Sequence, residues 1–406
     1  MGTLSKYFYE ATRNKTCRDM LHPGCTCFEA GKIYIWQGLI GAMRHYLPGA
    51  VTALLFRMKH WDDTEVWRSF LTQYVRCIIA GLPMTAGSFH FFCGFYNLFG
   101  RFSAPFFVFI PSMLGACTCM WLPRSIVRTQ GIGLFNMYIE FLIKRSRSST
   151  IAAMRNSRLA GTLLFCILSA AMMPTQQYLQ VNRFWFATIH KDVEQDLNNN
   201  SMEAEKGQCK HHPGRSCLQH IFGQVKRSFY FGLTICLLKN VLPRITLAIK
   251  QPISFLRIIM SRFDYGLIGF FTCYKALFEV INCFLTENCQ FNPLTRSMIT
   301  GFISGASYCL YPNYLLFTYP ITELIELYWM IYMKSSLPKP KVAMLLDRLP
   351  TVMLMYAFSI GMMYHLRVVY PYYTNRYCHK LMDIGTSGRS EVLARGYAEI
   401  MMGYRD

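Results

Sequence analysis

The chain has 406 residues, of which 52% are hydrophobic and only 16% are charged, and its mean hydropathy is +0.20. This composition favours a membrane protein over a set of soluble domains. The formal net charge of +20 arises from short basic clusters beside apolar stretches, such as Lys144, Arg145 and Arg147, and not from a separate basic domain. That pattern is typical of contact with anionic lipid headgroups, and it excludes a nucleic-acid-binding module.

Apolar stretches long enough to cross a bilayer recur along the chain. A polar segment at 1–32 precedes a first helix expected at 33–56, and the following apolar stretch at 70–100 contains Gly81, Pro83 and Gly87, where we expect a break. The clearest expected spans are 104–123, 159–180, 265–285, 294–317 and 349–364. Two further helical segments, 126–143 and 321–333, either cross the membrane or lie on its surface. The sequence therefore predicts an all-α polytopic membrane protein, since it lacks the short alternating strands of a barrel.

The two halves of the sequence match one another at a constant offset of 190 residues. Residues 153–173 and 343–363 are identical at eight of 21 positions, and the His-Pro-Gly motif at 22–24 recurs at 212–214. We therefore expect an internal duplication of a unit of roughly 190 residues with four or five helices in each copy. The expected regions are an N-terminal Cys/His-containing segment (1–32), a first membrane repeat (33–181), a polar acidic linker (182–211), a second membrane repeat (212–370) and a polar tail (371–406).

Small residues four positions apart indicate a close helix–helix contact around Gly301 and Gly305. Gly115 is the counterpart of Gly305 in the first half of the sequence, and both are followed by alanine. We therefore assign Gly115, Gly301 and Gly305 as helix-packing residues.

A basic residue lies four positions before a proline in the first helix of each half: Arg44 before Pro48 and Lys239 before Pro243. Broken helices at matching positions of two repeats indicate a transporter site at the repeat interface, where a charge is paired or faces water. The alternative is a kinked or interfacial helix whose basic side chain reaches the headgroups.

Acidic residues occur in the fourth segment of each half, Glu140 in the first and Glu323 with Glu326 in the second. Within the membrane, Glu140 and Glu326 could bind a cation or pair with the two basic residues of the first helices; on a surface helix they would be solvated. Lys275 and Glu279 are four apart in an otherwise apolar helix, and this spacing predicts that they pair with each other.

Cysteine and histidine residues cluster near the start of each half. The first cluster is Cys17, His22, Cys25 and Cys27, and the second is Cys209, His211, His212, Cys217 and His220. Zinc accepts these ligands, but the paired Cys-x-x-Cys spacing of strong signatures is missing. A disulfide from Cys17 and free thiols beside a Pro-Gly turn are the other interpretations, so the sequence assigns no metal and no cofactor. It also contains no catalytic motif, and we expect no catalytic residues and no enzyme activity.

Several short motifs, in their order along the chain, resemble the transmembrane protein 135 family over nearly the whole length. They are His22-Pro23-x-Cys25, Arg155-Asn156 followed by Leu163-Leu164-Phe165-Cys166-Ile167, Gln251-Pro252-x-x-x-Leu256, Tyr274-Lys275, and Gly301-Phe302 with Gly305. The resemblance implies a multi-pass protein of mitochondrial and peroxisomal membranes, linked to the balance of mitochondrial fission and fusion and to lipid metabolism. It also implies a distant likeness to the helices of the inner-membrane protein translocases.

Two functional hypotheses follow. The first is a non-enzymatic regulator of mitochondrial and peroxisomal organisation that acts by scaffolding or recruiting partners. The second is a transporter or lipid-handling channel built from duplicated repeats. In either case the expected partners are membrane lipids and, for the scaffold, organelle-division or other membrane proteins; nucleic acid is not among them, and an oligomer is compatible with the sequence.

Overall fold

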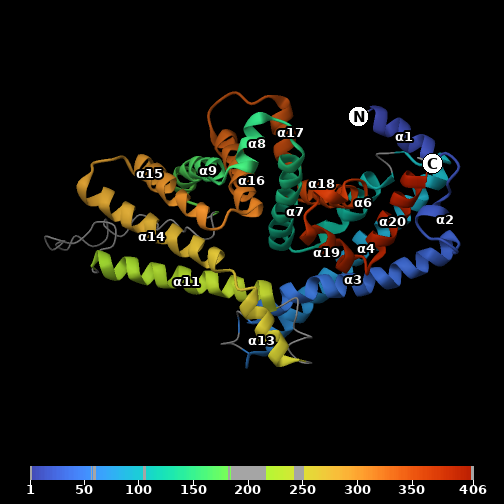
Figure 1. The fold of residues 1–406 in the computed structure, drawn as a ribbon, viewed down its shortest axis with the longest axis horizontal. Helices are drawn as coiled ribbons and strands as arrows, with labels where there is room; N and C mark the ends of the chain where they lie inside the picture. The colour runs from blue at the N-terminus through green and yellow to red at the C-terminus, as the bar shows by residue number, and fades with distance from the viewer. Residues whose placement is uncertain are drawn as a thin grey trace. The chain divides into compact units, whose positions relative to one another are not determined.

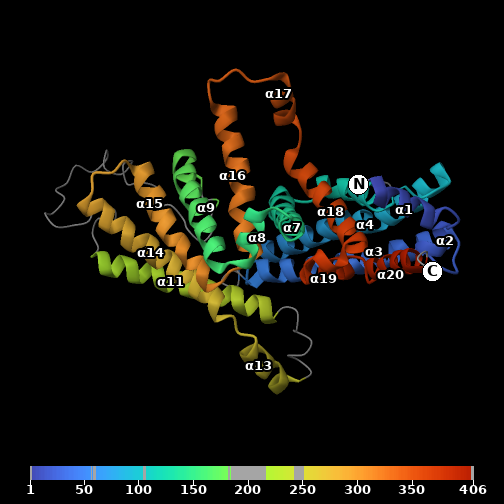
Figure 2. The same ribbon diagram turned by 45° about the horizontal axis from the view of Figure 1, so that its top comes forward.

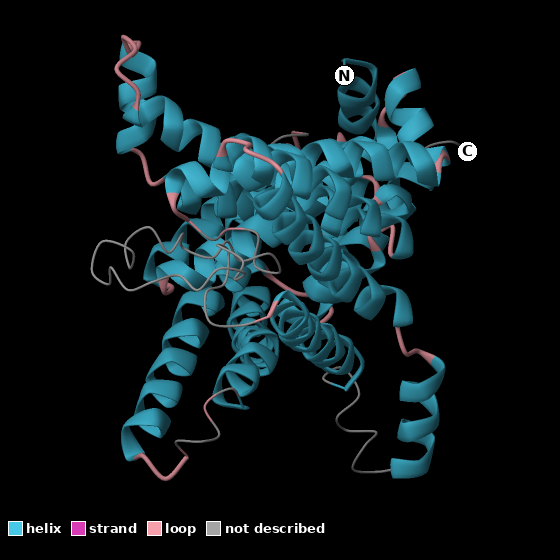
Figure 3. Cartoon of the chain, turned by 90° about the vertical axis from the view of Figure 1, so that its left-hand side faces the viewer, coloured by secondary structure: helices cyan, strands magenta, loops and turns pink. Residues whose placement is uncertain are grey.

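The computed structural model describes residues 2–55, 57, 61–103, 107–181, 183, 216–241 and 251–403. Within these ranges every regular element is a helix (Figure 3), which confirms the all-α prediction for this part of the chain. The chain forms two compact units: unit 1 comprises residues 1–145 and 339–406, and unit 2 comprises residues 146–338. The expected linker at 182–211 lies outside the described residues, apart from Arg183.

Unit 1 is built from both ends of the chain. Its helices are α1 (Gly2–Thr12), α2 (Cys17–Met20), α3 (Cys27–Leu55), α4 (Thr64–Phe99), α6 (Phe109–Ala116), η2 (Cys117–Trp121), α7 (Arg124–Arg145), α17 (Lys341–Arg348), α18 (Thr351–Val369), η5 (Pro371–Tyr373), α19 (Arg376–Gly385) and α20 (Arg389–Gly403). Helix α18 contacts α6, α7 and α20, while α4 packs against α3 and α6. Tyr356 of α18 and Phe92 of α4 are among the large side chains fully buried in this core.

Unit 2 is continuous in sequence. Its helices are α8 (Ser149–Asn156), α9 (Arg158–Leu179), α11 (Cys217–Val241), α13 (Pro252–Ser261), α14 (Tyr265–Asn288), α15 (Pro293–Gly305), η4 (Ala306–Leu310) and α16 (Tyr314–Lys334). Helix α15 lies between α9 and α14, and α14 also packs on α11, as Figures 1 and 2 show. Two buried aromatic side chains lie at the centre of this unit. Phe165 of α9 stacks on Tyr308, and the Tyr274 hydroxyl of α14 forms a hydrogen bond of 2.6 Å with the Ser169 hydroxyl.

In the part of the chain that the structure describes, four helices are long and apolar enough to cross a membrane: α4, α9, α14 and α18. Their outer faces carry exposed apolar side chains at helical spacing, for example Leu159, Leu163 and Ile167 on α9. Exposed leucine and isoleucine stripes of this kind are costly in water and favourable in lipid. The chain is therefore a helical protein that fits a membrane environment.

Two of the expected spans are wrong as continuous helices. In the 294–317 stretch, α15 tightens into η4 and ends before Pro312, and α16 begins after Asn313, whose side chain accepts a hydrogen bond from the Leu315 N–H at 2.8 Å. Proline has no N–H to continue the ladder, and an asparagine cap starts a new helix. The described part of the 104–123 stretch is likewise only the short pair α6 and η2, which ends before Pro123. The expected break at Pro83 is also wrong, because Pro83 lies inside α4, a single helix of 36 residues.

Candidate functional site

The predicted helix-packing residues of α15 lie directly against α9. A Cβ atom added to Gly305 would lie 2.7 Å from the Cys166 Cα, and one added to Gly301 would lie 2.7 Å from the Ser169 carbonyl oxygen. Real Cβ atoms do not approach backbone this closely, so only glycine permits this separation of the two helices. The structure thus places both predicted helix-packing glycines at the close contact between α15 and α9.

Gly115 also lies at a close helix contact, but with a different neighbour. An added Cβ would lie 2.8 Å from the Met84 carbonyl oxygen of α4, in a contact that the sequence alone did not identify. The contact between α6 and α18 uses another glycine, Gly361 of α18, whose Cβ would lie 2.9 Å from the Phe109 carbonyl oxygen. The sequence analysis missed Gly361, although Ala357 lies four positions before it and this spacing of small residues could have identified it.

A buried ionic cluster lies at the contact between α11 and α14. The Glu279 carboxylate, which is fully buried, lies 2.7 Å from Lys275 Nζ through one oxygen and 3.3 Å from His220 Nε2 through the other. Lys275 and His220 are also buried. The predicted pairing of Lys275 with Glu279 is confirmed. His220, assigned by sequence to the second Cys/His cluster, instead contacts this carboxylate, while Cys209, His211 and His212 lie outside the described residues.

The two acidic residues of the fourth segments have local partners. Glu140 of α7 is buried, and its carboxylate lies 2.6 Å from Lys144 Nζ and 3.0 Å from Asn375 Nδ2. Glu326 of α16 pairs with Arg183 at 3.3 Å. The expectation that Glu140 is solvated on a surface helix is therefore wrong, because side chains of α7 and of the segment before α19 enclose it.

Arg44 and Lys239 do not meet these acids, so the hypothesis that Glu140 and Glu326 pair with them is wrong. Arg44 is exposed on α3, which continues through Pro48 to Leu55, and it forms no ion pair with a described residue. The Lys239 side chain is 53% exposed, and its Nζ lies 2.9 Å from Asp264 and 3.1 Å from the Tyr311 hydroxyl. Long basic side chains reach water from their helices in this way. Pro243 lies outside the described residues.

Three of the four residues of the first Cys/His cluster lie together in unit 1, with one further cysteine that the sequence analysis did not include. Cys17, His22 and Cys27 converge with Cys93 of α4, and their donor atoms all lie within 4.8 Å of one another. Cys25 does not belong to this group. The sequence analysis missed Cys93 because it is distant in the chain, although the spacing of 66 residues between Cys27 and Cys93 recurs between residues 217 and 283 and could have identified it.

Comparisons with protein-family models, with curated proteins and with solved structures gave no match to this chain. The resemblance to the transmembrane protein 135 family therefore stays a prediction, and the site rests on its own geometry.

Proposed function

We propose that this protein is a non-enzymatic, multi-pass protein of mitochondrial and peroxisomal membranes that regulates organelle organisation and lipid metabolism by scaffolding or recruiting membrane partners. The organelle assignment rests on the resemblance to the transmembrane protein 135 family. The mode of action rests on the close, glycine-mediated packing of membrane-length helices, with α15 against α9 as the clearest case. Buried charges are neutralised locally, as at Glu140 and Lys144, which suits a rigid scaffold.

We further propose that the chain is a duplicated unit whose last helices are exchanged. The starts of α3 and α11 are 190 residues apart, as are those of α7 and α16, and α6 with η2 corresponds to α15 with η4. The contacts also correspond: α3 with α4 and α11 with α14, α4 with α6 and α14 with α15. By this correspondence α9 and α18 are equivalent, yet α9 packs in unit 2 and α18 in unit 1. The first half of the sequence thus supplies α9 to unit 2, and the second half supplies α18 to unit 1. A distant likeness to translocase helices would then apply to each unit.

The duplication is parallel by this proposal, and the topology can be measured. Among the described residues, the four candidate spans fall two in each half, and the proposal takes α4 and α9 as the two crossings that separate residues 22–24 from residues 212–214. Protease-sensitive tags placed beside the two His-Pro-Gly motifs are expected to be on the same side of the membrane in intact organelles. Protection of one tag and cleavage of the other would require an odd number of crossings and an inverted duplication, which would favour alternating access.

The proposed function is tested by rescue with the double variant Arg44→Ala/Lys239→Ala. Both side chains are exposed, so the variant is expected to restore mitochondrial length and peroxisome number in depleted cells as well as the wild-type chain does. Removing one exposed ion pair changes stability by less than about 1 kcal/mol, so the variant should also accumulate normally. The proposal would be contradicted if the wild-type chain localised to other membranes, or if depletion left both organelles unchanged. If the variant accumulates normally and fails to rescue, the result favours transport.

One observation favours the transporter as the second candidate. In the cluster inside unit 2, Lys275 and Glu279 lie on α14, a helix long enough to span a membrane, and His220 lies on α11. Ionisable groups in such positions commonly mark proton or ion pathways. A proton flux into liposomes that carry the purified chain, abolished by His220→Gln, would support this alternative over the scaffold.

A further inference from the structure

The loop between α2 and α3 holds His22 in one orientation. The Cys25 N–H donates to the His22 carbonyl oxygen at 3.2 Å, which closes a turn with Pro23 and Gly24 at its centre. Gly24 has φ +78°, the left-handed value that glycine adopts without strain at the third position of a type II turn. The Cys25 carbonyl oxygen then lies 3.0 Å from His22 Nδ1. Because a carbonyl only accepts, Nδ1 carries the proton, and the lone pair of Nε2 is directed away from this bond.

Cys17 and Cys27 are each the first residue of a capped helix. In both cases the preceding threonine donates through its backbone N–H and its hydroxyl to the carboxylate three residues later. These pairs are Thr16 with Asp19 and Thr26 with Glu29. Capping boxes fix the entry of a helix, so both thiols are held by local structure. The third thiol, that of Cys93, is held by the long helix α4.

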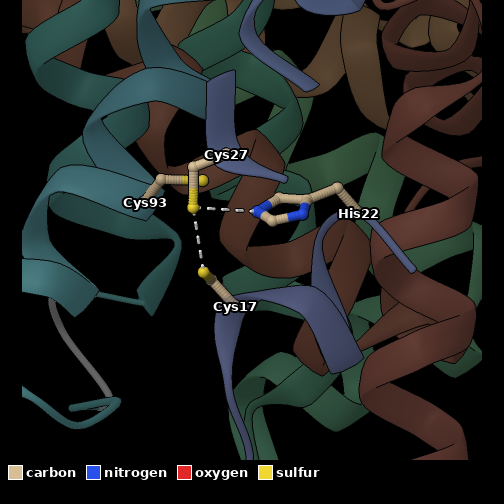
Figure 4. Close-up of side chains that lie close together, drawn as sticks. All are labelled: Cys17, His22, Cys27 and Cys93. Carbon is tan, nitrogen blue, oxygen red and sulfur yellow. Dashed lines mark hydrogen bonds between the residues drawn. The ribbon is translucent and has the colours of Figure 1, made fainter. Parts of the chain in front are cut away.

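The separations match those of a tetrahedral metal site. The Sγ atoms of Cys17 and Cys27 are 3.4 Å apart, and His22 Nε2 lies 3.5 Å from the Cys27 Sγ (Figure 4). With zinc–sulfur bonds of about 2.3 Å and zinc–nitrogen bonds of about 2.0–2.1 Å, neighbouring donors of a tetrahedron lie roughly 3.5–3.8 Å apart. A disulfide would instead bring two sulfurs to about 2.05 Å, and all four cysteines of this region are free.

The environment suits a structural rather than a catalytic cation. Cys17, His22 and Cys93 are buried and Cys27 is partly buried, so four donors from one chain would close the coordination sphere. Cysteine binds a metal as the thiolate, so a cation would bind here with release of thiol protons. The His22 Nδ1–H donates to a backbone carbonyl, as metal-bound histidines usually do.

The internal repeat gives independent support. His22, Cys27 and Cys93 each match the same residue type 190 positions later, at 212, 217 and 283. A buried cysteine that only filled space could be replaced by alanine or valine in one half. The joint retention of three donors at one offset is the pattern of a set that acts together.

We propose that Cys17, His22, Cys27 and Cys93 form a structural zinc site that fastens the N-terminal segment to the C-terminal part of α4. Three thiolates and one imidazole nitrogen are a ligand set that selects zinc, and a closed tetrahedron leaves no position for substrate. The site stabilises unit 1, where Tyr34 near the start of α3 donates to the Leu21 carbonyl oxygen at 3.1 Å in the same region. This inference does not depend on the proposed cellular function.

The first test compares Cys93→Ser with Cys25→Ser as the matched control. Full-length chain is purified in detergent under reducing conditions, and its zinc is measured by mass spectrometry. We expect Cys93→Ser to carry one zinc ion less per chain than the wild type, and Cys25→Ser to carry as much as the wild type. The zinc contents of the variants are compared with that of the wild type, because the second Cys/His cluster could bind zinc of its own and raise the absolute content of all three proteins. Equal zinc in all three proteins, or equal loss in both variants, would overturn the proposal.

The second test uses the wild-type chain, because Cys93→Ser could impair folding. Cys25 and Cys27 are both partly buried, so the alkylation rate of Cys25 serves as an internal control for that of Cys27. We expect Cys27 to be protected until a zinc chelator is added, and Cys25 to react equally with and without chelator. Cobalt added after chelation should then give the visible absorption of tetrahedral thiolate-bound Co²⁺. Reaction of Cys27 that is independent of the chelator, a Cys17–Cys27 disulfide in the mass spectrum, or bound iron in place of zinc would each overturn the assignment.

Discussion

Replacing Glu279 with glutamine is expected to destabilise the protein by about 3–5 kcal/mol, the cost of breaking a buried ion pair by removing one partner. Glutamine preserves the shape of the side chain but removes the charge that neutralises Lys275 at 2.7 Å. Both side chains are buried, so water cannot replace the lost partner. The measurement is the thermal unfolding of the purified chain in detergent, followed by helical circular dichroism.

The matched control is Glu391→Gln, which removes the acid of another ion pair at i and i+4. The Glu391 pair with Arg395 is exposed, so its loss should cost less than about 0.5 kcal/mol. Combining Glu279→Gln with Lys275→Met should recover most of the lost stability, because a neutral apolar side chain replaces the charge that had lost its partner. If Glu279→Gln unfolds at the temperature of Glu391→Gln, the cluster does not stabilise unit 2.

Replacing Gly305 with alanine is expected to cost about 1–3 kcal/mol, the usual penalty for overpacking a well-packed contact. The new methyl group would lie 2.7 Å from the Cys166 Cα and 3.2 Å from its backbone nitrogen. These are backbone atoms, so α9 and α15 must separate as whole helices. We expect a lower unfolding temperature and faster alkylation of Cys166, which is buried in the wild type.

Gly223→Ala in α11 is the control for this prediction, because a Cβ at Gly223 meets no atom within 4 Å. That change is expected to be neutral or to stabilise the helix by up to about 1 kcal/mol, the difference in helix propensity between glycine and alanine. Unchanged stability and unchanged Cys166 protection in Gly305→Ala would show that the two helices are not held at the separation described here.

Much of the fold follows from local sequence. Helices α9, α14 and α18 lie within a few residues of the apolar stretches that predicted them, because hydrophobic periodicity and length are local properties. The errors concern prolines, whose effect on a helix depends on its surroundings. Pro83 does not end α4 because the helix is packed along its length against α3 and α6, whereas Pro312 does end a helix because Asn313 caps the next one.

The candidate sites divide in the same way. The ion pair of Lys275 and Glu279 follows from spacing within one helix, and so does the close helix contact at Gly301 and Gly305. The contact of His220 with Glu279 and the position of Cys93 beside Cys17 depend on which helices pack together, which no local pattern reports.

Three properties can be predicted from the amino-acid sequence: the helical class of this protein, its membrane-length helices and the 190-residue offset on which the proposed duplication rests. These properties depend on composition and on spacing along one chain, and both can be read without knowing the fold. Three other properties depend on tertiary packing: α9 packs in unit 2 and α18 in unit 1, Glu140 is enclosed, and Cys93 completes a group of four donors. Each of these outcomes is a choice of partner between elements distant in sequence, and the apolar faces of different helices are too similar for the sequence to make that choice.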